Sequence, residues 1–174
     1  MRLLVLGLLA LGVLGCDSGD GASPAPVAWQ WVEEGRLIAS PAPERAAGGS
    51  EGWWRSLDQA AGDRPLAVLN LRETPDPEPP AGLSVDSLQA PIPDFGVPSA
   101  EVTSRALQFI ASRLAAGKVV VVHCGAGCGR TGTILALHLK HSQGIPADEA
   151  IRRVREARRC AVETPEQEAF VREN

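Results

Sequence analysis

The 174-residue sequence has no tyrosine, three phenylalanines and one methionine. This scarcity of aromatic residues argues against the stacking platform on which proteins hold single-stranded nucleic acid. Lys and Arg number 17 against 21 Asp and Glu, so the net charge is -4 and binding to nucleic acid through bulk positive charge is disfavoured. Four unevenly spaced cysteines are too few for a small disulfide-rich fold. With 44% hydrophobic residues, the chain is instead expected to form one ordinary domain with its own core.

The N-terminus predicts an export signal. Arg2 gives a positive start, and the apolar stretch that follows, residues 3–15, is shorter than the roughly 20 residues of a membrane-spanning helix. The stretch ends in VLGC, which resembles the lipobox of bacterial lipoproteins and implies that Cys16 is lipidated after residues 1–15 are removed. Residues 16–27 are then a polar linker. We therefore expect an exported, membrane-anchored lipoprotein on the periplasmic or cell-surface side, and an ordinary cleaved secretory signal is the alternative.

Residues 28–174 are expected to form a single α/β domain. Strands are predicted at 28–32, 36–40, 66–71, 83–88 and 119–122, and helices at 53–61, 99–116, 131–141, 147–159 and from 164 onward. The alternation of strands and helices predicts a central, mainly parallel sheet of four to five strands that is flanked by helices. The four consecutive valines of residues 119–122 indicate a strand buried on both faces.

The most informative segment is residues 119–133, VVVVHCGAGCGRTGT, in which a buried strand enters a glycine-rich loop and then a helix. This order points backbone N–H groups and the positive end of a helix at one place, which creates an anion site. A nucleotide-binding loop of the GxxxxGK[ST] type is excluded, because Arg130 stands in place of Lys and Cys124 in place of Gly. A metal site is a second alternative, with loosely spaced candidate ligands: Cys124, Cys128, His138, His141 and Cys160.

The pattern His123-Cys124-x5-Arg130-Thr131 resembles the signature of cysteine-dependent protein tyrosine phosphatases, and the short chain resembles their compact dual-specificity-like or bacterial type. A cysteine just before a helix N-terminus is stabilised as a nucleophilic thiolate. The loop returns Arg130 to the same phosphate, where its planar fork can hold two oxygens. The residues that the resemblance assigns to phosphate binding are Gly125, Ala126, Gly127, Cys128, Gly129 and Arg130.

The resemblance also implies roles for neighbouring residues. Thr131 hydrogen-bonds the nucleophilic sulfur and helps it leave, and His123 orients the loop or is simply a buried structural histidine. Residues 93–98, PDFGVP, resemble the mobile acid loop of the family, which makes Asp94 the general acid and later the base. Taken alone, Asp94 is better explained as a turn residue in a proline-rich loop, and its position thirty residues before Cys124 favours the acid.

Two further stretches carry the resemblance toward the C-terminus. Residues 149–159, EAIRRVREARR, look like the penultimate helix of the compact phosphatases. Residues 163–167, ETPEQ, resemble the segment whose glutamine positions the hydrolytic water, so Gln167 is a candidate for that role or an ordinary exposed helix residue.

The expected function is phosphoester hydrolysis through a cysteinyl-phosphate, without a metal or other cofactor. The expected substrate is a phosphorylated protein or a small phosphate ester, and the uncharged loop favours a singly phosphorylated one. Cys128 and Cys160 could pair with each other or with Cys124, or stay buried as free thiols. The rival hypothesis is a tethered module that binds phosphorylated ligands without turnover. A rhodanese-type sulfurtransferase fits less well, because it has no use for Asp94.

Overall fold

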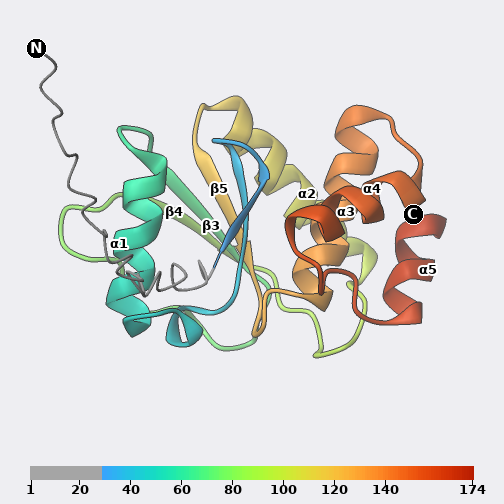
Figure 1. Cartoon of the computed structure of the whole chain (residues 1–174), viewed down its shortest axis with the longest axis horizontal. Helices are drawn as coiled ribbons and strands as arrows, with labels where there is room; N and C mark the ends of the chain where they lie inside the picture. The colour runs from blue at the N-terminus through green and yellow to red at the C-terminus, as the bar shows by residue number, and fades with distance from the viewer. Residues whose placement is uncertain (1–28) are drawn as a thin grey trace, which may run out of the picture.

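A five-stranded sheet forms the centre of the protein (Figure 1). The computed structural model describes residues 29–174, so the expected signal segment, Cys16 and the linker lie outside the described residues. The strands are β1 (Gln30–Glu33), β2 (Leu37–Ser40), β3 (Leu66–Asn70), β4 (Val85–Gln89) and β5 (Val119–His123). They lie in the order β1-β2-β5-β3-β4, with β1 antiparallel to β2 and all other neighbours parallel. The predicted α/β class and mainly parallel sheet are confirmed.

Strand β5 lies in the middle of the sheet, between β2 and β3. Side chains of successive strand residues point to opposite faces, so Val119 and Val121 enter one core while Val120 and Val122 enter the other. All four valines are fully buried. The run of valines therefore fills both layers of the sandwich, as predicted.

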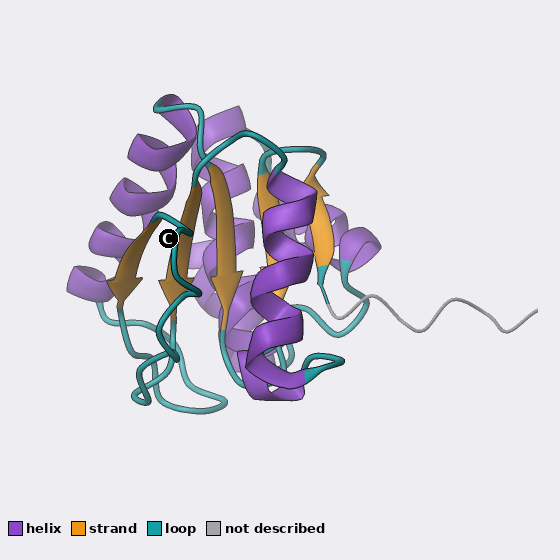
Figure 2. Cartoon of the chain, turned by 90° about the vertical axis from the view of Figure 1, so that its left-hand side faces the viewer, coloured by secondary structure: helices purple, strands orange, loops and turns teal. Residues whose placement is uncertain are grey.

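Helices cover both faces of the sheet (Figures 1 and 2). Helix α1 (Gly49–Ala61) packs on the face that carries Val119 and Val121. The opposite face is covered by α2 (Ala100–Ala115), α3 (Gly129–Gln143), α4 (Ala147–Ala157) and α5 (Pro165–Glu173). A short 3-10 turn, η1 (Pro43–Arg45), connects β2 to α1.

Two helix starts follow the expected capping chemistry. Ser99 precedes α2, and its Oγ accepts a hydrogen bond from the backbone N–H of Val102 at 3.2 Å. Thr164 precedes α5 and forms a reciprocal capping box with Gln167. Helix α1 begins at Gly49, four residues before the predicted start at Trp53. The sequence did not indicate this first turn, because its residues are polar or glycine and show no apolar periodicity.

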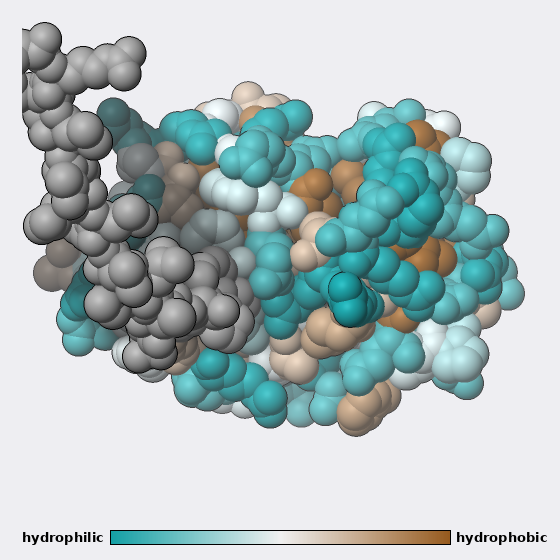
Figure 3. All heavy atoms as spheres, viewed as in Figure 1, coloured by the Kyte–Doolittle hydropathy of each residue, from teal (hydrophilic) through white to brown (hydrophobic). Residues whose placement is uncertain are grey.

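The outer surface of the helical layer is polar. In Figure 3 hydrophilic residues cover much of the region around α4, where Arg152, Arg153 and Glu156 are exposed. Arg152 and Arg153 both pair with Glu149 and lower the pKa of that carboxyl group to about 2.

Among the helices of residues 29–174, none combines the length and apolar character that crossing a bilayer requires.

Candidate active site

The glycine-rich loop joins the end of β5 to the start of α3. We call residues 124–130 the phosphate loop. Cys128 is the N-cap residue of α3, so the backbone N–H groups of the first helical turn face the loop and make its end electropositive. β2 and β3 run parallel to β5, and the carboxyl ends of all three strands lie at this edge of the sheet. This is the edge at which open α/β sheets bind their ligands.

Close packing fixes the course of the phosphate loop. Gly127 has a φ of +72°, and a Cβ at this position would lie 2.3 Å from the carbonyl oxygen of Ser40. A Cβ at Gly129 would lie 2.7 Å from Oε1 of Gln167. The carbonyl oxygen of Gly125 accepts a hydrogen bond from the backbone N–H of Ala42 at 3.0 Å. The loop is therefore held between the end of β2 and the start of α5. A Cβ at Gly127 would collide with backbone atoms, whereas a Cβ at Gly129 would require the ends of the Gln167 and Glu163 side chains to shift.

The side chain of Arg130 turns back toward the start of the loop. A Cβ added to Gly125 would lie 3.4 Å from Nη2 of Arg130. Nη1 of Arg130 donates to the carbonyl oxygen of Ile92 at 3.1 Å, and Nη2 lies 2.7 Å from Oδ1 of Asp94. The guanidinium is nine-tenths buried, whereas the side chain of Asp94 is 69% exposed. The structure thus brings the predicted acid and the predicted phosphate-binding arginine into contact across 36 residues of sequence.

The predicted nucleophile is a buried, unpaired thiol. Cys124 is 2% exposed and is the free cysteine among the described residues. Thr131, which follows Arg130 in the first turn of α3, is fully buried, and its hydroxyl has no hydrogen-bond partner within residues 29–174. A buried hydroxyl without a partner is costly, so its place beside the loop suits the predicted contact with the nucleophilic sulfur.

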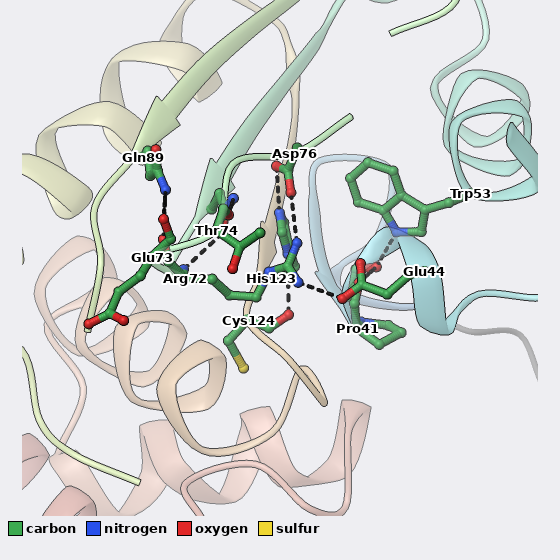
Figure 4. Close-up of polar contacts among 12 residues, drawn as sticks. Pro41, Glu44, Trp53, Arg72, Glu73, Thr74, Asp76, Gln89, His123 and Cys124 are labelled. Carbon is green, nitrogen blue, oxygen red and sulfur yellow. Dashed lines mark hydrogen bonds and ion pairs between the residues drawn. The ribbon is translucent and has the colours of Figure 1, made fainter. Parts of the chain in front are cut away.

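A polar network holds His123 next to the start of the phosphate loop (Figure 4). Nε2 of His123 lies 2.9 Å from Oδ2 of Asp76, and Nδ1 lies 3.3 Å from the carbonyl oxygen of Cys124. Asp76 also pairs with Arg72 at 3.3 Å, and Arg72 pairs with Glu44. Both ring nitrogens of His123 thus lie next to oxygen atoms, one of a carboxylate and one of the backbone. The side chain of Cys124 points away from this network.

The ring of His123 is also fixed by packing. Trp53 of α1 lies edge-on to it, with ring centroids 5.5 Å apart. Nε1 of Trp53 donates to the hydroxyl of Ser40 at 2.8 Å. The histidine is fully buried, as its interpretation as a structural histidine expects, and its role in orienting the loop stays a prediction.

Gln167 is fully buried, so the interpretation of this residue as an ordinary exposed helix residue is wrong. Its Oε1 accepts hydrogen bonds from the backbone N–H groups of Glu163 and Thr164 at 2.9 and 3.3 Å. Its Nε2 donates to the carbonyl oxygen of Gly96 at 3.1 Å. Gln167 therefore links the start of α5 to the loop that carries Asp94.

Cys128 and Cys160 form a disulfide in the structure, with their Cα atoms 5.1 Å apart. Nearby, Nη2 of Arg158 donates to the carbonyl oxygen of Ala126 at 2.6 Å. Burial lowers the pKa of Arg158, and the charge of Cys124 opposes that shift.

Among residues 29–174 no three His, Cys, Asp or Glu side chains are grouped closely enough to hold a metal ion. The cysteines and histidines considered as metal ligands thus do not form a ligand set in this part of the chain.

Sequence reasoning missed Asp76 and its contact with His123. Asp76 lies in the proline-rich loop of residues 74–82, which has no periodicity that would orient a side chain. A signal existed in the sequence, because this loop follows β3, and β3 pairs in parallel with β5 so that Asn70 lies beside His123. A carboxylate shortly after Asn70 is therefore within reach of His123.

A protein-family model matches residues 56–143, about half of the chain, and its description is a polymorphic toxin system DSP-PTPase phosphatase. The matched range includes Asp94, Cys124 and Arg130. The chain therefore belongs to the DSP-PTPase phosphatase family.

Individual curated proteins match parts of the chain. An uncharacterized protein of Methanocaldococcus jannaschii is 41% identical over 92 residues, which cover 52% of this chain and 60% of the relative. Protein tyrosine phosphatase domain-containing protein 1 of Mus musculus is 39% identical over 80 residues, covering 46% of this chain and 11% of the mouse protein. The chain thus spans between about a tenth and three fifths of the length of these two curated relatives.

Solved structures show the same fold. The crystal structure of Tk-PTP in the active form has a TM-score of 0.67 and 34% identity, and the match covers 84% of this chain and 95% of that chain. Human DUSP28 matches with a TM-score of 0.63 and 21% identity, over 87% of this chain and 97% of that chain, a likeness of fold alone. Fold and family together define a protein-tyrosine-phosphatase-like protein.

Proposed function

We propose that this protein is an exported phosphoester hydrolase of the protein tyrosine or dual-specificity phosphatase type that works through a cysteinyl-phosphate. One observation carries the proposal: a buried free thiol, an inward-turned arginine and a carboxylate on that arginine meet at one glycine-rich loop. A thiolate is the expected nucleophile for a phosphate held by backbone N–H groups. The neighbouring carboxyl group of Asp94, in its protonated form, supplies the proton that a leaving alkoxide or phenoxide needs.

In the first step, Sγ of Cys124 attacks phosphorus, and the bond between phosphorus and the leaving oxygen breaks. Arg130 and the backbone N–H groups of the phosphate loop hold the phosphoryl oxygens, whose charge they stabilise most strongly in the transition state. Asp94 gives its proton to the leaving oxygen. The products of this step are the alcohol or phenol and a phosphate bound to Cys124.

In the second step, water attacks the cysteinyl-phosphate, and the bond between sulfur and phosphorus breaks. Asp94, now a carboxylate, takes a proton from this water. The hydroxyl of Thr131 hydrogen-bonds the departing thiolate, a role supported by its burial without a partner in the described structure. Gln167 positions the water, supported by its contact with the carbonyl of Gly96 in the acid loop. The step releases inorganic phosphate and restores the thiolate.

The proposed substrate is a phosphorylated protein or a small phosphate ester. Gly125, Ala126 and Cys128 carry no charge, so the loop offers no extra cation for a second phosphate. The proposed location is outside the cytoplasm, anchored to a membrane through lipidated Cys16. The Cys128–Cys160 disulfide supports this location, because such bonds persist mainly in oxidising compartments.

The direct test is hydrolysis of p-nitrophenyl phosphate by the purified full chain, in the presence of a metal chelator. Cys124→Ser and Asp94→Asn variants are assayed beside it, and tungstate binding to each is measured by calorimetry. We expect chelator-resistant hydrolysis that is abolished in Cys124→Ser and weakened in Asp94→Asn. Tungstate binding without hydrolysis by the unmodified chain would favour the phospho-ligand binding module, and hydrolysis that survives Cys124→Ser would overturn the assignment of the nucleophile.

A further inference from the structure

The two halves of the phosphate loop are secured in different ways. In the first half, the backbone N–H of Ala42 donates to the carbonyl oxygen of Gly125, and Gly127 packs closely against the carbonyl group of Ser40. The second half, residues 128–130, begins at Cys128, which is bonded through sulfur to Cys160, 32 residues further along the chain. Cys128 is also the N-cap of α3, so its position sets the direction of the N–H groups in the first helical turn.

Cys160 belongs to a connection that is itself firmly held. We call residues 158–164, between α4 and α5, the α4–α5 connection. Arg155 of α4 donates to the carbonyl oxygens of Ala161 and Val162 at 3.0 and 2.7 Å, and to Glu168 of α5 at 2.6 Å. Val162 has a φ of +54°, which a β-branched residue adopts only where its surroundings impose it. The α4–α5 connection is therefore fixed by these contacts to both of its flanking helices.

We propose that the Cys128–Cys160 disulfide holds the phosphate loop in its oxyanion-binding conformation, which makes Cys160 a positioning residue for the reaction. This inference rests on the proposed function, because it takes residues 124–130 as the phosphate-binding loop. The bridge ties the N-cap of α3 to the rigid α4–α5 connection, so the N–H groups stay aimed at one point. Without it, Cys128 is free to shift, and small misplacements of binding groups lower affinity steeply.

The bridge can be opened from the solvent side. Cys160 is exposed, whereas Cys128 is nine-tenths buried. A dithiol attacks Sγ of Cys160, the bond between the two cysteine sulfurs breaks, and Cys128 leaves as a thiolate that takes up a proton. The second thiol of the reductant then displaces Cys160, which yields two cysteine thiols and a cyclic disulfide of the reductant. This two-electron reduction leaves Cys124 unchanged.

The test compares the oxidised full chain with forms that lack the bridge. These forms are the dithiol-treated protein after removal of the reductant, Cys160→Ser, and the double variant Cys128→Ser with Cys160→Ser. Cys16→Ser is the matched control, since it removes a cysteine outside the bridge. Peptide mapping without reduction establishes the linkage in each sample, calorimetry gives the tungstate Kd, and p-nitrophenyl phosphate gives kcat and KM.

We expect the tungstate Kd and KM to rise about tenfold in every form that lacks the bridge, with a smaller change in kcat. Reoxidation with oxidised glutathione should restore the dithiol-treated wild type but neither serine variant. A bridge that serves global stability alone would lower the melting temperature of the variants while Kd and KM stayed at the wild-type values, and that result would overturn the proposal. So would a peptide map without the Cys128–Cys160 linkage.

The same experiment separates this proposal from the proposed function. Tungstate binding needs no turnover, so a protein that hydrolyses nothing still decides the role of the bridge. Absence of hydrolysis with bridge-dependent tungstate binding would overturn the phosphatase and support the positioning role. Absence of tungstate binding to the oxidised wild type would overturn both.

Discussion

The carboxylate of Asp94 lies 2.7 Å from Nη2 of Arg130, on the guanidinium that is proposed to bind the substrate phosphate. An incoming oxyanion must therefore compete with Asp94 for this group or share it. The acid loop is held in this position at a second point, because Gln167 donates to the carbonyl of Gly96. The acid and the anion site are thus coupled before any substrate binds.

This coupling gives Asp94→Asn two opposite effects. Loss of the proton donor should lower kcat for p-nitrophenyl phosphate by about 10²-fold or more. Loss of the competing ion pair should tighten tungstate binding by a factor of up to about five, since a partly exposed ion pair is worth roughly 1 kcal/mol at most. Asp63→Asn, in an exposed turn, is the matched control for kinetics and calorimetry. Equal loss of kcat and of tungstate affinity would contradict the account.

Asp76→Asn tests the contact beneath the nucleophile. Asparagine can still accept a hydrogen bond from His123, but a neutral amide oxygen is a weaker acceptor than a carboxylate oxygen. We expect alkylation of Cys124 by iodoacetamide at pH 6 to slow by about tenfold, because a histidine held less firmly leaves the N–H groups of the phosphate loop less well aimed at the sulfur. Asp58→Asn on the exposed face of α1 is the control. If Asp76 serves only the fold, the melting temperature should fall while the alkylation rate stays unchanged.

Gln167→Ala removes a side chain that satisfies two backbone N–H groups at the start of α5. The variant should lose about 1–2 kcal/mol in the free energy of unfolding, measured with urea. If Gln167 also positions water, breakdown of the cysteinyl-phosphate should slow, and p-nitrophenol should appear in a burst. Gln108→Ala, on the exposed side of α2, provides the comparison. Wild-type stability in the Gln167 variant would show that the capping contacts contribute little.

His138 should make stability depend on pH. Burial lowers the pKa of His138, Arg36 and His141 lower it further, and Glu33 opposes the shift. The unfolded chain then binds more protons below about pH 6.5, so the stabilisation is present above that pH and is lost as the pH falls. His138→Gln should reduce the loss of unfolding free energy between pH 7.5 and 5.5 more than His141→Gln, which removes only one smaller contribution to the shift and leaves the burial of His138 in place. Equal losses in both variants would contradict the assignment.

The strands and the phosphate loop were predictable because their residues obey local rules. The valines of β5 form an apolar run that indicates a buried strand. The glycines after Cys124 indicate a loop directly after that strand, whatever the tertiary fold. The Asp76–His123 contact was not predictable in this way, since no periodicity orders a proline-rich loop. The Cys128–Cys160 pairing remained one of several possibilities, because spacing alone does not determine which cysteines meet.

For Gln167, the sequence predicted the helix but not the burial of the side chain. Its position in the first turn of α5 is read easily from Thr164 and Pro165. Its burial depends on the acid loop, which lies 71 residues earlier in the chain and packs against it only in the folded protein. Local rules thus located the helix but not the environment of its side chain.

The measurement that tests the central claim most directly is capture of the covalent intermediate. The full chain is mixed with p-nitrophenyl phosphate, quenched with acid within milliseconds, digested and mapped by mass spectrometry. The account predicts phosphate on the peptide that contains Cys124, at higher occupancy in Gln167→Ala and absent in Cys124→Ser. Phosphate on another residue, or turnover in Cys124→Ser at the wild-type rate, would contradict it.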